Sequence, residues 1–183
     1  MNLTSDFIEK LKSGDRMAIT DLYCQSFNTL MSVAVRYKRN EEDQKTIVND
    51  SFIKLLKSLD SYNLERPFLP WAKQITKNVV IDSFRKEKNY THLFDFDATN
   101  EGTEIEIEYD IDSDVLNEKL RHLLNSLPPA TNLVFNLFAI EEYSIKEICE
   151  ELNIGYETVK WHIKEARKRL RLKLQEHKTI EIH

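Results

Sequence analysis

The chain has 183 residues, of which 41% are hydrophobic and 31% charged, and its formal net charge is -5 at pH 7. This length is enough for one medium domain or two small ones. Three glycines and four prolines are too few for a loop-rich β-sandwich or a glycine-rich phosphate-binding enzyme. Cys24 and Cys149 lie far apart without metal-ligand spacing, no apolar run reaches the roughly 20 residues of a membrane span, and no signal-peptide pattern opens the chain. We therefore expect a cytoplasmic protein without a metal, a cofactor or direct membrane insertion.

The charges are strongly segregated along the chain. Residues 66–88 carry six basic side chains against two acidic ones, and residues 158–178 carry eight against two. Between them, residues 89–114 hold nine acids and no Lys or Arg. Two basic segments on either side of an acidic one indicate contacts with a polyanion at two places. The alternative is that each basic segment is an ordinary solvated helix face.

Hydrophobic residues recur at three- and four-residue steps through the first 88 residues, which predicts successive helices. Residues 13–15 separate the first helix from the second, and Asn40 opens a third helix that extends to Leu59. A loop is expected over residues 60–70, stiffened near its far end by two prolines. A fourth helix is expected from Trp71 to the basic residues near position 86.

The acidic segment, residues 89–114, has no helical period. Within residues 105–111, isoleucine and tyrosine alternate with acids, a period of two that is typical of a strand when another strand pairs with it. The acidic bias favours a flexible linker, which is our interpretation.

The C-terminal part shows a helix-turn-helix pattern. Ser144 and Glu147 have capping-box spacing at the start of a short helix, and residues 153–155 predict a tight turn. A longer basic helix follows from about Tyr156, in the arrangement whose second helix enters the major groove of DNA. The sequence thus predicts an all-α fold of two small helical domains joined by an acidic flexible linker, with the helix-turn-helix in the C-terminal domain. An αα-hairpin with a basic flank is the alternative to a DNA-binding motif.

The inward positions of the second helix leave a defined set of side chains to face DNA, with Arg167 and the basic residues after it placed for phosphates. The predicted base-facing residues are Tyr156, Glu157, Thr158, Lys160, Trp161 and His162.

Several motifs together resemble the bacterial extracytoplasmic-function sigma factors of RNA polymerase. In the C-terminal half, the matching residues are Leu127-Pro128-Pro129, Tyr143 to Ile148, Leu152-Asn153-Ile154, Thr158-Val159-Lys160 and Ala166 to Leu170. In the N-terminal half, they are Gly14-Asp15, Asp21-Leu22-Tyr23, Asn40 with Asp43, Asp50 with Phe52-Ile53-Lys54, Trp71-Ala72, and Asn78 with Asp82 and Arg85-Lys86. Two motif sets in the family's order are more specific than either set alone.

The resemblance implies a domain order. Residues 1–88 correspond to sigma region 2, residues 89–114 to a linker, residues 115–176 to sigma region 4, and residues 177–183 to a tail. Region 2 docks on core RNA polymerase and reads and melts the promoter -10 element, whereas region 4 reads the -35 element. Here Gly155 replaces the usual Ser before the recognition helix, and Glu165 replaces a basic residue, so an unusual recognised sequence is expected.

The resemblance also assigns residues to these contacts. The expected polymerase-binding residues are Asp43, Asn49, Asp50, Ile53 and Lys54. The expected -10 residues form a pocket for an unstacked base and a basic helix face for the released strand, and they are Ser61, Tyr62, Asn63, Phe68, Lys73, Lys77, Asn78, Arg85 and Lys86. The -35 residues are the base-facing set above together with Arg167.

The predicted function is therefore a promoter-specificity subunit whose partners are core RNA polymerase and promoter DNA, with an anti-sigma factor as a further candidate. The alternative is a stand-alone helix-turn-helix regulator, which needs one basic reading domain rather than two. No nucleophile–base pair, phosphate loop or metal-ligand cluster is visible, so no catalytic residue is expected.

Overall fold

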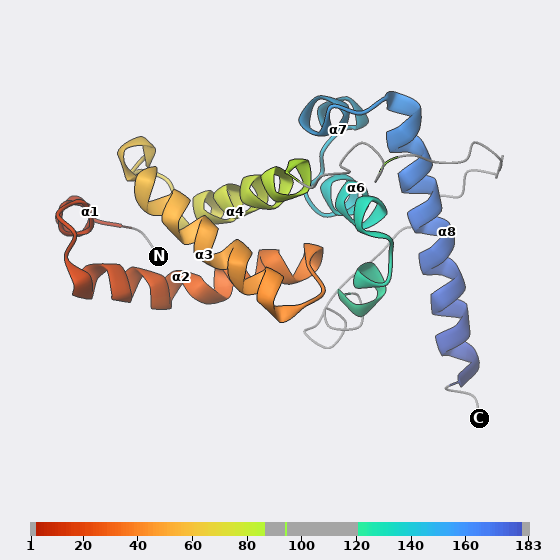
Figure 1. Ribbon diagram of the computed structural model, residues 1–183, viewed down its shortest axis with the longest axis horizontal. Helices are drawn as coiled ribbons and strands as arrows, with labels where there is room; N and C mark the ends of the chain where they lie inside the picture. Colours follow the sequence, from red (N-terminus) through yellow and green to blue (C-terminus); the bar gives the residue numbers. More distant parts are fainter. Residues whose placement is uncertain (1–2, 87–93, 95–120, 181–183) are drawn as a thin grey trace. The chain divides into compact units, whose positions relative to one another are not determined.

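The computed structural model describes residues 3–86, 94 and 121–180. The chain divides into two compact units, Met1–Lys86 and Glu87–His183. Every regular element in the described ranges is a helix (Figure 1), which confirms the predicted all-α fold. Except for Phe94, the expected linker with its alternating stretch at residues 105–111 lies outside the described residues. Among the helices described, none has the length and apolarity that crossing a bilayer would require.

The first unit is built on three long helices that pack against one another pairwise, α2, α3 and α4. Side-chain oxygens of Thr4, Asp15 and Asn40 accept hydrogen bonds from N–H groups at the starts of α1, α2 and α3, so each helix begins at a polar cap. The elements are α1 (Ser5–Lys12), α2 (Arg16–Tyr37), α3 (Glu41–Lys57), the 3-10 helix η1 (Leu59–Ser61) and α4 (Phe68–Arg85).

The core of this unit lies where α4 meets α2 and α3. Phe68 and Phe84, at the two ends of α4, are both almost fully buried. Their partners in the core include Leu22 and Leu30 of α2 and Leu55 of α3, which have no exposed surface. Because α4 contacts two helices at once, its buried stripe is wide and fixes which of its side chains face outward.

The fourth helix begins three residues earlier than the sequence pattern predicts. It begins at Phe68 rather than Trp71, with Pro67 as its N-cap residue and Pro70 inside its first turn. Proline is tolerated there because the N–H groups of the first turn have no partner within the helix. The early start moves Phe68 from the expected loop into the helix.

The second unit contains α6 (Pro129–Ala139), α7 (Ile145–Leu152) and α8 (Tyr156–Ile180), preceded by helical residues 121–125. Both α6 and α7 pack against α8. The predicted capping box is confirmed, since Ser144 N donates to Glu147 Oε2 at 2.8 Å and Glu147 N donates to Ser144 Oγ at 3.3 Å. A hydrogen bond from Ser144 Oγ to Glu147 Oε2 at 2.7 Å, together with the one from Ser144 N, lowers the pKa of the Glu147 carboxyl. The helix ends at Asn153, whose φ of 51° is left-handed and turns the chain into α8.

One apolar cluster joins helical residues 121–125 and α6 to the middle of α8. Its members are Leu124, Leu127, Phe135, Ala166 and Leu170.

A buried polar pair lies beside this cluster. Asn132 Nδ2 donates to Leu124 O at 3.0 Å, and Asn136 Nδ2 donates to Asn132 O at 3.0 Å. These bonds satisfy polar groups that would otherwise be costly to bury, and they fix the position of α6 against the preceding helical segment.

We expect Ser144→Ala to destabilise the second unit by about 1 kcal/mol, because it removes the side-chain cap of α7. Chemical denaturation of the full chain in a Trp71→Phe background, in which Trp161 is the remaining tryptophan, measures the free energy of unfolding of the second unit by fluorescence. The matched control is Ser144→Thr, which retains a capping hydroxyl and should lose much less. Equal losses in the two variants would show that the capping hydroxyl is unimportant.

Candidate nucleic-acid interface

A pocket of about 370 Å³ opens beside the loop that joins η1 to α4. The rings of Tyr62 and Trp71 have centroids 4.9 Å apart, and Tyr62 Oη donates to Arg66 O at 2.5 Å, which holds the loop against the aromatic wall. The pocket is lined by Ser61, Tyr62, Asn63, Arg66, Pro67, Pro70, Trp71 and Gln74. Aromatic walls with a polar rim suit a flat base that has left its stack.

Hydrogen bonds within the loop orient the polar rim of this pocket. Asn63 Oδ1 accepts from Glu65 N at 2.8 Å, which leaves the Asn63 amide N–H groups as donors. Gln74 Nε2 donates to Asn78 Oδ1 at 3.1 Å, which leaves the Gln74 carbonyl oxygen as an acceptor. The Arg66 side chain is exposed and has no ion pair with any described residue. The rim therefore offers donors, an acceptor and a positive charge.

Three of the nine residues expected to contact the -10 element are buried, and for two of them, Phe68 and Lys77, this corrects the expectation. Phe68 has no exposed surface, because α4 begins there and places its ring in the core. Lys77 is only 5% exposed, because the wide buried stripe of α4 includes its position. Tyr62 is also buried, but its ring forms part of the pocket wall.

Sequence reasoning missed Arg66, Trp71 and Gln74 as pocket residues. Trp71 is half-buried and lines the pocket. The available signal was helical spacing, since Gln74 lies three residues after Trp71 and shares its face of α4.

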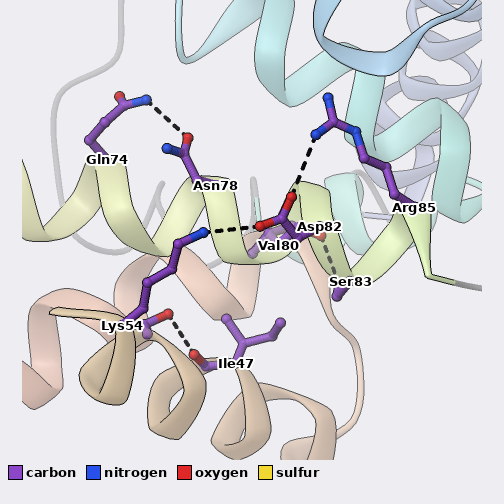
Figure 2. Close-up of polar contacts among 9 residues, drawn as sticks. Ile47, Lys54, Gln74, Asn78, Val80, Asp82, Ser83 and Arg85 are labelled. Carbon is purple, nitrogen blue, oxygen red and sulfur yellow. Dashed lines mark hydrogen bonds and ion pairs between the residues drawn. The ribbon is translucent and has the colours of Figure 1, made fainter. Parts of the chain in front are cut away.

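The outer face of α4 carries the remaining expected -10 residues. Lys73, Arg85 and Lys86 are exposed, and Asn78 is half-buried. Figure 2 shows Asn78 hydrogen-bonded to Gln74.

Asp82 links the outer face of α4 to α3 through two cations. Its carboxylate lies 3.0 Å from Lys54 Nζ and 3.5 Å from Arg85 Nη1 (Figure 2). All three side chains are partly exposed, so these ion pairs orient the cations more than they stabilise the fold.

A second hollow, of about 350 Å³, follows the line between α3 and α4. It brings together Asp50, Ile53 and Lys54, three of the five expected polymerase-binding residues. Ile53 is 51% exposed and places an apolar side chain beside the charged residues of this hollow.

The other two expected polymerase-binding residues lie outside this hollow. Asn49 faces α2, where its Oδ1 accepts from Tyr23 Oη at 3.2 Å. Asp43 is in the first turn of α3, where its Oδ2 accepts from Asn40 Nδ2 at 2.6 Å.

The helix-turn-helix of the second unit presents one side of α8 to solvent. Tyr156, Glu157 and Lys160 are exposed, and Thr158 and Trp161 are half-buried. Arg167 lies with its guanidinium carbon 5.8 Å from the centre of the Phe138 ring. This side of α8 thus retains most of the predicted base-facing and phosphate-facing residues.

The structure corrects the expectation that His162 faces DNA. Its side chain is 2% exposed, and its Nδ1 lies 3.0 Å from Thr131 Oγ1 of α6. Phe94 covers it, with ring centroids 5.5 Å apart in an edge-to-face contact. Burial lowers the pKa of His162 to about 4, although the nearby Glu165 carboxylate acts to raise it. His162 is therefore neutral near pH 7 and supplies no charge for phosphate binding.

Glu165, which stood out in the sequence as an acid among bases, is neutralised within the helix. Its Oε1 lies 2.5 Å from Arg169 Nε, one turn further along α8. The ion pair lessens the repulsion that an isolated carboxylate would exert on DNA phosphates.

Each unit thus combines a helical core with a polar or basic outer surface. Comparison with known families supplies the class of protein: residues 22–90 match the family model Sigma-70 region 2, and residues 117–170 match Sigma-70, region 4, which are two parts of a transcription initiation factor.

Individual relatives cover almost the whole chain. The ECF RNA polymerase sigma factor SigW of Bacillus subtilis is 29% identical over 181 residues, which span 92% of this chain and 95% of the relative. The ECF RNA polymerase sigma-E factor of Haemophilus influenzae is 26% identical, with coverage of 92% and 93%. The chain belongs to the extracytoplasmic-function sigma factors. As a sigma subunit it directs transcription initiation, and the family consists of non-enzymatic initiation factors.

Two solved structures are similar over most of their length. CnrH in complex with the cytosolic domain of CnrY is 22% identical, with a TM-score of 0.45 and coverage of 93% of this chain and 96% of that one. RpoE in complex with the anti-sigma factor NepR, from Bartonella quintana, is 18% identical, with a TM-score of 0.48 and coverage of 85% and 96%.

We expect the second unit to lose stability as the pH falls from about 6.5 to about 4. The pKa of His162 is lower in the folded chain than in the unfolded chain, so the unfolded state binds the proton more tightly. The loss begins below about pH 6.5, where the unfolded state takes up the proton, and reaches about 3 kcal/mol below about pH 4, where both states are protonated. Denaturation at a series of pH values measures it.

His162→Gln should flatten this pH dependence, because glutamine does not titrate. His122→Gln is the matched control, since His122 is exposed in the same unit. An unchanged slope in His162→Gln would contradict the assignment.

Proposed function

We propose that the chain binds core RNA polymerase through the hollow between α3 and α4 and reads two promoter elements, one with each unit. Residues 1–88 would act as region 2, residues 89–114 as the linker, residues 115–176 as region 4, and residues 177–183 as a tail. The observation that carries the proposal is the aromatic-walled pocket at the start of a basic helix in one unit, combined with a helix-turn-helix in the other.

The polymerase contact is proposed for Asp50, Ile53 and Lys54, with Asn49 and Asp43 further along α3. An exposed apolar side chain between charged neighbours fits a helix of another protein, because burial of Ile53 supplies affinity and the charges fix the register. Asp82 holds Lys54 at the edge of this hollow.

The -10 contact is proposed for the pocket and the outer face of α4. Tyr62 and Trp71 provide rings for a flipped base, Ser61 and Asn63 provide polar atoms at the rim, and Arg66 lies where a backbone phosphate would follow the base. The exposed Lys73, Arg85 and Lys86, with Asn78, would then hold the released strand.

The -35 contact is proposed for the exposed side of α8. Tyr156, Glu157, Thr158, Lys160 and Trp161 lie in its first two turns, where recognition helices contact base edges. Arg167 lies on a later turn and is assigned to the phosphate backbone.

We propose no reaction catalysed by the chain itself and, because its partners are the polymerase and the chromosome, a location in the bacterial cytoplasm. An anti-sigma factor stays a predicted partner from the family resemblance.

Transcription from a pool of genomic promoter fragments, with purified core polymerase, tests the proposal as a whole. We expect transcripts that depend on the chain and share two upstream elements. Lys160→Ala should relax the base preference at the -35 element, because it removes an exposed base-facing side chain. Lys146→Ala, which changes an exposed lysine of α7, is the control. Failure to support transcription, with specific duplex binding by the chain alone, would overturn the sigma assignment.

We expect Asn63→Ala and Arg66→Ala each to slow promoter opening about tenfold, because each removes one contact to an unstacked nucleotide. Fluorescence of 2-aminopurine in the -10 element reports opening, and a native gel reports holoenzyme formation, which should stay unchanged. Glu65→Ala is the matched control, since Glu65 is an exposed neighbour that does not line the pocket. Weakened holoenzyme formation instead would place these residues in the polymerase contact.

A further inference from the structure

Phe94, from the acidic segment between the two sets of helices, is an aromatic side chain buried against α8. It is 4% exposed, and its ring meets the His162 ring at 89° with 5.5 Å between centroids. The neighbouring Trp161 ring also contacts the His162 ring, with 4.9 Å between centroids at 84°. We call His162 and Trp161 the Phe94 socket. Edge-to-face pairs of this kind add to the affinity that burial alone provides.

The Phe94 socket lies within the part of α8 proposed to read DNA. Trp161 belongs to the exposed side, and Lys160 and Lys164, on either side of the socket in sequence, are both exposed. Phe94 itself belongs to residues 89–114, which hold nine acids and no Lys or Arg. Charge complementarity therefore favours association of this segment with α8.

In the docked state one ring nitrogen of His162 lacks a hydrogen bond, and this unfavourable term favours release of Phe94. His162 Nε2 is buried and has no hydrogen-bond partner among the described residues, although Nδ1 has Thr131. Leaving a buried nitrogen unpaired is unfavourable. Release of Phe94 would expose this nitrogen to water and recover part of the cost.

When Phe94 is docked, the short stretch of chain before it limits how far apart two promoter elements can be if the chain is to contact both at once. Only residues 87–93 separate it from Lys86 at the end of the first unit, and this stretch spans at most about 29 Å in any conformation. Promoter elements named for positions -10 and -35 lie about 25 base pairs apart, or roughly 85 Å along the duplex. Adding the 18 residues of α4, which are about 27 Å long, gives a reach of about 56 Å, shorter than the distance between the two elements. With Phe94 released, residues 87–120 reach roughly 120 Å.

We propose that the Phe94 socket is an intramolecular docking site, occupied by Phe94 in the free protein and vacated when the chain binds a promoter at both elements. This inference rests on the proposed reading of two elements. While Phe94 is docked, only residues 87–93 separate it from the first unit, so only the released population can bind both promoter elements. The apparent affinity of the chain for a promoter is therefore reduced in proportion to the released fraction.

The occupancy of the socket is measured by NMR titration of histidine in the full chain, with His162→Gln identifying the signal. In the wild-type chain the pKa of His162 should be about 4. Phe94→Ala should raise it toward the ordinary value near 6.5, because water then reaches the ring. Phe96→Ala, two residues away in the same segment, is the matched control and should behave as the wild type. Equal titration of all three chains would overturn the docking.

The consequence for transcription is measured with core polymerase and a two-element promoter at limiting concentrations of the chain. Phe94→Ala should raise transcript yield about threefold to tenfold, and Phe96→Ala should not. Equal yields, with a raised pKa in Phe94→Ala, would overturn the regulatory role of the socket. Equal gains in both variants would also overturn it, because the effect would then belong to the segment rather than to the socket. Absence of transcripts from every chain would refute the proposed function, whereas the titration would still report the docking.

Discussion

Burial of one side of α4 is the constraint on which the first unit depends. The same helix supplies the centre of the core, one wall of the base pocket and one side of the α3–α4 hollow. Phe68 and Phe84 fix both of its ends in the core, so rotation of α4 would disturb packing along its whole length. The outward side chains are therefore held in place by apolar contacts on the opposite face. Promoter opening and polymerase binding, as proposed, share one rigid support.

In the second unit, buried polar groups as well as apolar contacts fix how the helices pack. Inside it, the amide nitrogens of Asn132 and Asn136 donate to backbone oxygens, whereas Asn136 Oδ1 and His162 Nε2 are buried without a hydrogen-bond partner among the described residues. A buried polar atom with an unmet hydrogen bond is unfavourable. The one on His162 lies next to the proposed reading face of α8. The stability of this unit and the accessibility of its DNA-binding surface are therefore connected through one side chain.

Local signals in the sequence were sufficient for most of the helices, and the family resemblance of the motifs supplied the class of protein. The Ser144 capping box, the turn at Asn153 and the start of α8 all follow from residue types and spacing, because each depends on neighbours within a few positions. The burial of Phe68, Lys77 and His162 was beyond that reasoning. Each depends on which helices pack against its own, and α4 and α8 each contact two others.

The residues of the candidate site likewise include some that the sequence indicated and some that it did not. The family resemblance pointed to the loop residues Ser61 and Asn63, and both line the pocket. Arg66 was missed because the loop closes through Tyr62 Oη and the backbone of Arg66, a contact that no spacing rule predicts. Gln74 was missed although its helical spacing from Trp71 places both on one face of α4. The Phe94 contact joins residues 68 positions apart in the chain, and only a three-dimensional structure brings them together.

The separation of the two sides of α8 has an evolutionary consequence. Val159, Ile163, Ala166 and Leu170 face the core, and all are buried. Tyr156, Glu157 and Lys160 face solvent and contribute little to that packing. Substitutions at these outer positions therefore carry a small folding penalty. Because these outer positions are the ones proposed to read the -35 element, the recognised sequence can change through them while the core of the unit stays the same.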